Sequence, residues 1–220
     1  MVIRHADTFK RLGFPVYLTH AEFPKMAVLS TGVIRVSGEK RNQNWIGIAP
    51  FAQYDSKVYP LDLMQKVIDE VAWNTHYKLF LFGGGNKEKE QLNTLAKDKS
   101  NCIVVAGKLT LEQELQLISN LDLMLSMDSG NAHIAAMLGV KVITLWGATH
   151  PFAGFKPFYQ SLGNCLVSDR EKYPLLPTSV YGNKKVAGYE DAMRTISPEA
   201  VVEKINSIQS TSQSKGEKFN

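Results

Sequence analysis

Short runs of apolar residues alternate with amphipathic stretches along the chain from Trp45 onward. Apolar runs of this length between turn residues predict buried strands, and the amphipathic stretches predict helices. The predicted strands cover residues 45–50, 78–82, 102–106, 121–127 and 140–146. The predicted helices cover residues 61–74, 87–98, 111–120 and 131–139. This alternation is typical of the α/β class, with a Rossmann-like parallel sheet and helices on both faces.

Helix ends and loops carry signals of their own. Thr110 followed by Gln113 is a capping-box pattern, and Gly139 is placed to end a helix in the left-handed conformation. Loops that follow parallel strands lie at the carboxyl edge of the sheet, where ligands bind in such domains. We therefore expect four loops to meet at this edge: residues 50–57, 83–86, 107–110 and 128–133.

The two ends of the chain do not follow this alternation. Residues 1–44 hold one helical stretch, residues 6–12, and then an irregular run with Pro15, Pro24 and Gly32, which predicts the end of a preceding unit or a linker. An aromatic and proline-rich passage over residues 149–189 precedes a predicted helix at residues 198–208. The polar residues 209–220 predict a disordered tail, so the predicted domain spans residues 45–208.

Composition narrows the class of protein. The 220 residues are 44% hydrophobic and 21% charged, which suits one well-packed domain. The net charge of +4 is spread over lysines scattered among acids, which argues against nucleic-acid binding. Short basic runs such as Lys184-Lys185 favour a solvated loop, with an anionic partner or a membrane surface left open.

Cysteine usage and hydropathy point to a cytoplasmic protein. Cys102 and Cys165 are distant in sequence and lack C-x-x-C spacing, so we expect both to be reduced, buried and inert. No apolar run approaches the roughly 18 residues of a membrane-spanning helix, and the first residues lack the apolar core of a signal peptide. No cluster with metal-ligand spacing is present, and we expect neither a metal nor a cofactor.

The first candidate for chemistry is Asp128-Ser129-Gly130, where a buried strand meets a helix. The unpaired N–H groups and positive dipole end of a helix N-terminus favour phosphate, and glycine permits close approach of a ligand. Asp128 could accept hydrogen bonds from sugar hydroxyls beside the phosphates. The alternative interpretation is an ordinary helix N-cap, which the bare tripeptide favours.

Three further features are ambiguous by themselves. The loop Gly83-Gly84-Gly85 could pass close to a ligand or be a plain turn, and it does not match the dinucleotide pattern G-x-G-x-x-G. Lys57 could neutralise a diphosphate or be a solvated lysine. His133 could contact the same ligand or simply pack in the first turn of its helix.

The segment DSGNAHIAAMLGV at residues 128–140, followed by LWGATHP at residues 145–151, resembles the family-9 glycosyltransferases, the lipopolysaccharide heptosyltransferases. The similarity extends back through residues 107–112 to residues 50–60. Such enzymes have two Rossmann-like domains in the GT-B arrangement, with the donor held mainly by the second. The resemblance implies that this chain is the C-terminal, nucleotide-sugar-binding half, and that residues 1–44 are a remnant of the N-terminal domain with the interdomain linker.

The resemblance also implies roles at the phosphate and sugar end of a donor site. It places Lys57 at the donor phosphates, with Gln53 near them. It gives Asp128 the transferred sugar, and it completes the phosphate end with Ser129, Gly130 and His133.

At the nucleoside end, the loop that begins at Gly83 is the candidate to pass close to the donor. The resemblance implies that Glu88 or Glu90 holds the ribose, and it leaves that choice open. It also implies that Leu109 lies against the adenine, where backbone groups beside it could contact the base edge.

The implied reaction is metal-independent, inverting transfer from an ADP-heptose-like donor to a hydroxyl of a lipopolysaccharide core-type acceptor. It needs a general base, which in the family is an aspartate of the N-terminal domain. We expect that base and the acceptor site to be absent from this chain. The implied location is cytoplasmic, with peripheral association at the inner face of the cytoplasmic membrane left open.

Other functions stay open from the sequence. The chain could be a non-catalytic nucleotide-sugar-binding module, another GT-B enzyme such as a nucleotide-sugar epimerase, or an oxidoreductase of the same fold type. An in-frame N-terminal α/β half upstream would favour the transferase. The passage over residues 152–194 could be a lid or acceptor-side loop, or a surface insertion without substrate contact.

Overall fold

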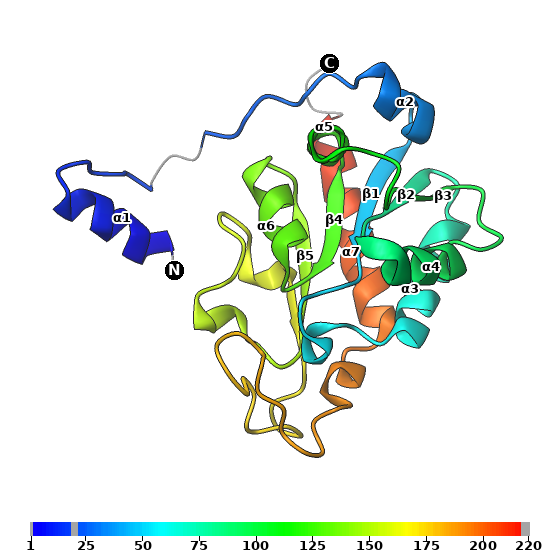
Figure 1. Cartoon of the computed structure of the whole chain (residues 1–220). Helices are drawn as coiled ribbons and strands as arrows, with labels where there is room; N and C mark the ends of the chain where they lie inside the picture. Colours follow the sequence, from blue (N-terminus) through cyan, green and yellow to red (C-terminus); the bar gives the residue numbers. More distant parts are fainter. Residues whose placement is uncertain (1, 19–21, 217–220) are drawn as a thin grey trace.

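The computed structural model describes residues 2–18 and 22–216, which form an α/β domain around one parallel sheet (Figure 1). The six strands lie in the order β3-β2-β1-β4-β5-β6. They are β1 (Asn44–Ala49), β2 (Tyr77–Leu81), β3 (Cys102–Val104), β4 (Leu123–Met127), β5 (Val142–Trp146) and β6 (Cys165–Val167). This is the strand order of the Rossmann fold. The predicted fold class is therefore confirmed.

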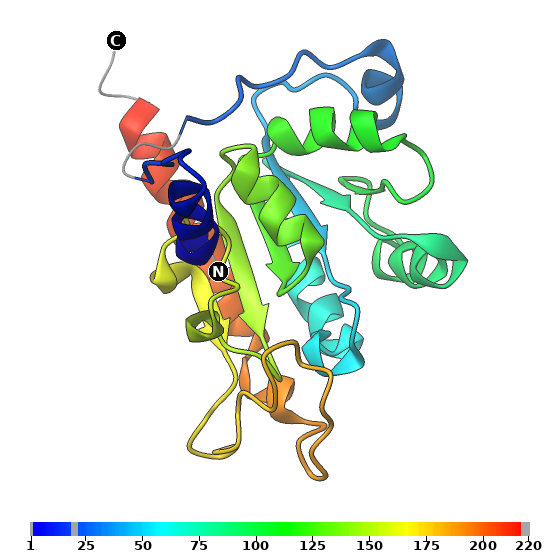
Figure 2. The ribbon, with the colours of Figure 1, turned by 60° about the vertical axis from the view of Figure 1, so that its left-hand side comes forward.

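Helices cover both faces of the sheet (Figure 2). The α-helices are α1 (Val2–Arg11), α2 (Thr31–Ser37), α3 (Leu61–Trp73), α4 (Gly85–Leu95), α5 (Leu111–Ser119), α6 (Gly130–Met137) and α7 (Pro198–Gly216). Short 3-10 helices are η1 (Asp55–Lys57), η2 (Pro151–Ala153), η3 (Leu162–Asn164) and η4 (Ala192–Thr195). α3, α4 and α7 pack on one face, and α2, α5 and α6 on the other.

The sheet is buried on both faces, which explains why its strands are nearly continuous apolar runs. Every residue of β4 and of β5 is buried. Leu125 faces the α3, α4 and α7 side, and its neighbour Met124 faces the other side. Ala49 of β1 is in register with Ser126 of β4, so the loops after these two strands start side by side.

Two predicted helix ends are confirmed. The Thr110 side chain accepts from the Gln113 backbone N–H, and the Gln113 side chain accepts from the Thr110 N–H, which completes the capping box. Gly139 has a φ of 79°, in the left-handed region that glycine tolerates best.

The helix after the glycine triplet begins earlier than predicted, at Gly85 rather than residue 87. Gly85 has a φ of 70°, which explains the need for glycine there. The Gly84 backbone N–H donates to Oε2 of Glu88 at 2.7 Å, so Glu88 caps its own helix.

Three elements differ from the prediction. α2 lies in the stretch predicted to be irregular; it is only seven residues long and is stabilised by packing against α5, where Val33 is fully buried. β6 is a three-residue edge strand, too short to show a hydrophobic period. α7 continues to Gly216, so residues 209–216 of the predicted tail are helical, and Gln209 is buried. Residues 217–220 lie outside the described residues.

The two cysteines differ from each other. Both are free. Cys102 is buried, and burial raises the pKa of its thiol to about 12, as expected for an unreactive cysteine. The prediction of a buried side chain is wrong for Cys165, which is only half-buried because it starts the edge strand β6.

The N-terminal helix stands apart from the domain in Figure 1. None of its residues is buried, and Ile3 and Phe9 are 70% and 51% exposed. In contrast, the chain from Phe23 onward contacts the domain: Ala27 exchanges hydrogen bonds with Ser119 and Asn120. Within the described ranges, no helix is both long and apolar enough to cross a membrane.

The central position of β4 makes Leu125 a sensitive test of the core. We expect Leu125→Ala to lower the free energy of unfolding by about 2–5 kcal/mol, because a fully buried leucine leaves a cavity when truncated. Leu175→Ala, at a side chain that is 60% exposed, should change it by less than about 0.5 kcal/mol. Urea denaturation followed by tryptophan fluorescence measures both, and equal losses would contradict this description of the core.

Candidate functional site

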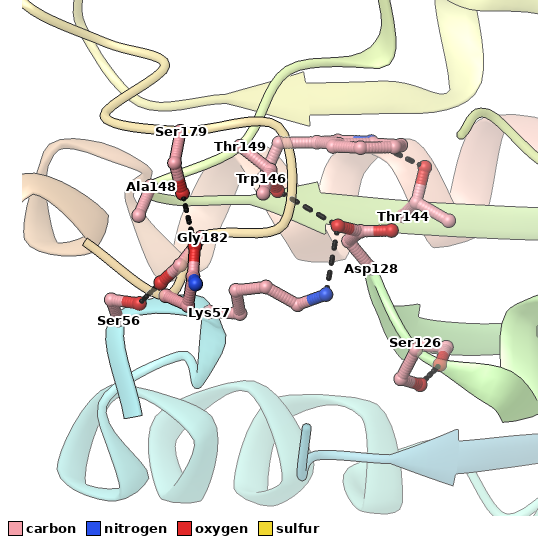
Figure 3. A network of polar contacts seen from close by, with 12 residues as sticks. Ser56, Lys57, Ser126, Asp128, Thr144, Trp146, Ala148, Thr149, Ser179 and Gly182 are labelled. Carbon is pink, nitrogen blue, oxygen red and sulfur yellow. Dashed lines mark hydrogen bonds and ion pairs between the residues drawn. The ribbon is translucent and has the colours of Figure 1, made fainter. Parts of the chain in front are cut away.

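The loops after β1, β4 and β5 bring three polar side chains together at the carboxyl edge of the sheet (Figure 3). Lys57 ends the 3-10 helix η1, Asp128 directly follows β4, and Thr149 lies shortly after β5. Lys57 Nζ is 3.0 Å from Asp128 Oδ2, and Thr149 Oγ1 donates to the same oxygen at 2.9 Å. The predicted meeting of the lysine loop with the Asp128 segment is therefore confirmed.

This ion pair is almost out of solvent, with the two side chains 13% and 7% exposed. Desolvation of such charges is costly unless they are paired and hydrogen-bonded. Here Lys57 supplies the opposite charge and Thr149 a hydrogen bond. Both contacts fall on Oδ2, and among the described residues no group donates to Asp128 Oδ1.

Backbone contacts fix the loop that carries Lys57. The Ala148 N–H donates to the Ser56 carbonyl at 3.0 Å. Gly147 makes this approach possible, since a Cβ there would lie 2.5 Å from the same carbonyl oxygen. The Ser56 hydroxyl donates to the Gly182 carbonyl at 2.6 Å. Lys57 is thus held between β5 and the segment around Gly182, as Figure 3 shows.

The N-terminus of α6 lies next to the ion pair. Its N-cap, Ser129, makes no side-chain cap bond, and its hydroxyl lies 3.0 Å from the Ser126 hydroxyl instead. Gly130 is exposed, and a Cβ added to it would meet nothing within 4 Å. The first amides of α6 therefore face open space without a capping side chain, which is the arrangement that favours an anion.

His133, in the first turn of α6, is half-buried beside the ion pair. Burial lowers the pKa of its imidazole; Asp128 opposes this shift and Lys57 adds to it. The site therefore favours the neutral imidazole, which can hydrogen-bond a ligand without changing the charge of the site.

A cavity of about 230 Å³ opens onto these groups. Its walls include six of the predicted site residues: Gln53, Lys57, Asp128, Ser129, Gly130 and His133. Three residues of the 152–194 passage complete it, Phe155, Val180 and Tyr181. The rings of Phe155 and Tyr181 have centroids 5.6 Å apart. Parts of the 152–194 passage therefore lie at the site, although no sequence signal identified those three side chains.

A second cavity, of about 360 Å³, shares Gln53, Ser129 and Gly130 with the first. It extends to Gly83 and Glu88, which the sequence predicted, and to Glu114, which it did not. The apolar part of its wall consists of Phe51, Ala52, Phe82 and Ile134. The two cavities therefore adjoin each other along the carboxyl edge of the sheet.

Two of the predicted residues lie elsewhere. Glu90 is exposed on α4 and lines neither cavity, whereas Glu88 lines the second. Leu109 is half-buried and packs against the core on the α2, α5 and α6 side, so it lines neither cavity. Across the part of the chain that the structure describes, no three His, Cys, Asp or Glu side chains are grouped to hold a metal ion.

The known proteins that match this chain in sequence belong to one family. A family model described as glycosyltransferase family 9 (heptosyltransferase) matches residues 10–186. Lipopolysaccharide heptosyltransferase 2 from Escherichia coli (strain K12) is 28% identical over 177 residues, covering 74% of this chain and 46% of that protein. Lipopolysaccharide heptosyltransferase 1 from Campylobacter coli is 31% identical over 118 residues, covering 50% and 33%. The chain spans about half the length, or less, of these curated relatives.

Solved structures show the same fold. ADP-heptose lipopolysaccharide heptosyltransferase II of E. coli matches with a TM-score of 0.63 and 21% identity, over 84% of this chain and 54% of that one. E. coli heptosyltransferase WaaC, solved with ADP, matches with a TM-score of 0.56 and 19% identity, over 76% and 44%. Because the family model extends over most of the chain, the chain belongs to glycosyltransferase family 9, the heptosyltransferase family.

Proposed function

We propose that this chain is the donor-binding half of a heptosyltransferase and that it binds a nucleotide sugar of the ADP-heptose type. The observation that carries the proposal is the pairing of Lys57 with Asp128 beside the uncapped N-terminus of α6, at the carboxyl edge of the sheet. A sugar diphosphate needs positive charge for its phosphates and acceptors for its hydroxyls, and this site offers both within a few ångströms.

The phosphates of the donor lie at Lys57 and the first turn of α6. Ser129 and Gly130 present the helix amides, with Gln53 and His133 at the cavity wall. The ammonium group of Lys57 has three donors, so it can contact a phosphate oxygen without releasing Asp128. This positive end stabilises the negative charge that develops on a departing diphosphate.

The transferred sugar lies in the smaller cavity, against Asp128. Oδ2 is occupied by Lys57 and Thr149, which leaves Oδ1 to accept from a sugar hydroxyl. Phe155 and Tyr181 supply apolar surface at the same cavity. Asp128 is held by an ion pair, so its role is to bind the sugar and not to take a proton.

The nucleoside lies in the larger cavity. Glu88 holds the ribose in preference to Glu90, since only Glu88 lines the cavity. The apolar residues Phe51, Phe82 and Ile134 suit a base. Leu109 lies behind this wall and supports it through packing.

Completion of transfer needs a second half that provides the acceptor site and the general base. In this proposal residues 1–44 are the end of that half and the interdomain linker, residues 45–208 the donor domain and residues 209–220 a C-terminal extension. The exposed apolar side chains of α1, such as Ile3 and Phe9, are consistent with a helix that packs on another domain. The reaction inverts the anomeric carbon, and the acceptor is of the lipopolysaccharide core type. The protein acts in the cytoplasm, at the inner face of the cytoplasmic membrane.

Titration calorimetry with ADP, UDP and GDP tests the donor assignment, and Lys57→Met tests the phosphate contact. We expect ADP to bind, and the variant to bind it about tenfold to a hundredfold more weakly, because a charge-assisted hydrogen bond contributes about 1.5–3 kcal/mol. Lys66→Met, at an exposed lysine of α3, should bind as the wild type does. Absence of ADP binding by folded protein would refute the donor assignment, and unchanged affinity in Lys57→Met would refute the phosphate role alone.

The Asp128→Asn variant tests the contact with the sugar separately from the contacts with the phosphates. The variant loses the negative charge that Lys57 faces, so its affinity for ADP should stay equal or rise. The extra affinity that ADP-heptose has over ADP should fall by about tenfold, because a neutral amide accepts a weaker hydrogen bond than a carboxylate. Calorimetry with both ligands measures the ratio. A ratio equal to that of the wild type would show that Asp128 does not hold the sugar.

A further inference from the structure

Glu114 is a half-buried carboxyl group in the wall of the larger cavity that no part of the proposed function uses. It lies in the first turn of α5, and its backbone N–H donates to Thr110. Among the described residues its carboxyl group accepts no hydrogen bond and forms no ion pair. Burial raises the pKa of this carboxyl above its ordinary value, and no partner opposes that shift.

A carboxyl group in this position is costly for the empty protein. A partly desolvated carboxylate loses hydration without gaining a partner, and a donor brought by a ligand restores what was lost. Glu88, which lines the same cavity, differs because it already accepts from the Gly84 N–H. Among the described residues that line this cavity, Glu114 is therefore a carboxyl group left without a protein donor and open to one that a ligand brings.

The strand order shows which end of a nucleotide reaches Glu114. The phosphates are proposed to lie at the N-terminus of α6, which follows β4. Glu88 and Glu114 belong to helices that follow β2 and β3, strands on the far side of β1 from β4. A nucleoside joined to a diphosphate at α6 extends from Ser129 and Gly130 toward these two carboxyl groups.

We propose that Glu114 determines nucleobase specificity by accepting a hydrogen bond from an exocyclic amino group of the base. This inference rests on the proposed donor site. The cavity selects a nucleoside diphosphate whose base carries such a group over one that presents a carbonyl oxygen at that position. A carboxylate accepts from an amino group and repels a carbonyl oxygen, so the group both attracts one class of base and rejects the other.

ADP and inosine diphosphate are suitable probes because they differ by the amino group and its replacement by a carbonyl. We expect wild-type protein to bind ADP at least about tenfold more tightly than inosine diphosphate in titration calorimetry. Glu114→Gln should bring this ratio close to one, because an amide can donate to the carbonyl of hypoxanthine. Glu112→Gln, at an exposed glutamate of the same turn, is the matched control and should keep the wild-type ratio.

A third ligand, 2′-deoxy-ADP, shows whether Glu114 contacts the base or the ribose. The preference for ADP over 2′-deoxy-ADP should be the same in wild type and in Glu114→Gln, and thermal unfolding should show that both are folded. An unchanged ratio of ADP to inosine diphosphate in Glu114→Gln would overturn the inference while leaving the donor site intact. A change confined to 2′-deoxy-ADP would overturn it by assigning Glu114 to the ribose. If the wild type binds no nucleoside diphosphate, the proposed function fails and the inference with it.

Discussion

The buried contact between Lys57 and Asp128 is the constraint on which the site depends. Two opposite charges that are nearly closed off from water must stay together, because separating them leaves each without compensation for its lost hydration. Keeping them together requires β1 and β4 to be neighbours, which the sheet order provides. It also requires the loop after β1 to lie against the end of β5, and Gly147 makes room for that approach. The central part of the fold therefore serves to hold one ion pair beside a helix N-terminus.

Much of this arrangement could be predicted because its cause lies in local pattern. Apolar runs predicted five of the six strands. Because loops that follow parallel strands lie at one edge of the sheet, the order of elements alone predicted that Lys57 and Asp128 share that edge. The capping box at Thr110 and the left-handed Gly139 were visible because each depends on a few adjacent residues. The sixth strand was not visible, since three residues cannot show a period. Helix α2 was missed because packing against α5 stabilises it, and its own sequence does not.

The remaining site residues needed three-dimensional structure for physical reasons. Residues 88 and 90 are two positions apart on a helix, about 200° around its axis, so only one of them can face a given cavity. The resemblance to the family left that choice open, and the structure places Glu88, and not Glu90, in the wall of the larger cavity. Phe155 and Tyr181 are separated by a long irregular passage, whose path depends on contacts made far along the chain. Glu114 has the sequence pattern of an ordinary helical glutamate, and only its burial sets it apart.

The hydrogen bond from Ser56 to the Gly182 carbonyl joins the loop that carries Lys57 to the segment that carries Tyr181. Gly182 also packs closely on the aliphatic part of Lys57, since a Cβ there would lie 2.8 Å from Lys57 Cδ. Tyr181, the residue before Gly182, lines the same cavity as Lys57. The position of Lys57 and the path of the segment around Gly182 are therefore mechanically coupled. In the proposed donor site, a substitution that repositions this segment to admit a different sugar would also shift the lysine, so sugar preference and diphosphate affinity would not evolve independently.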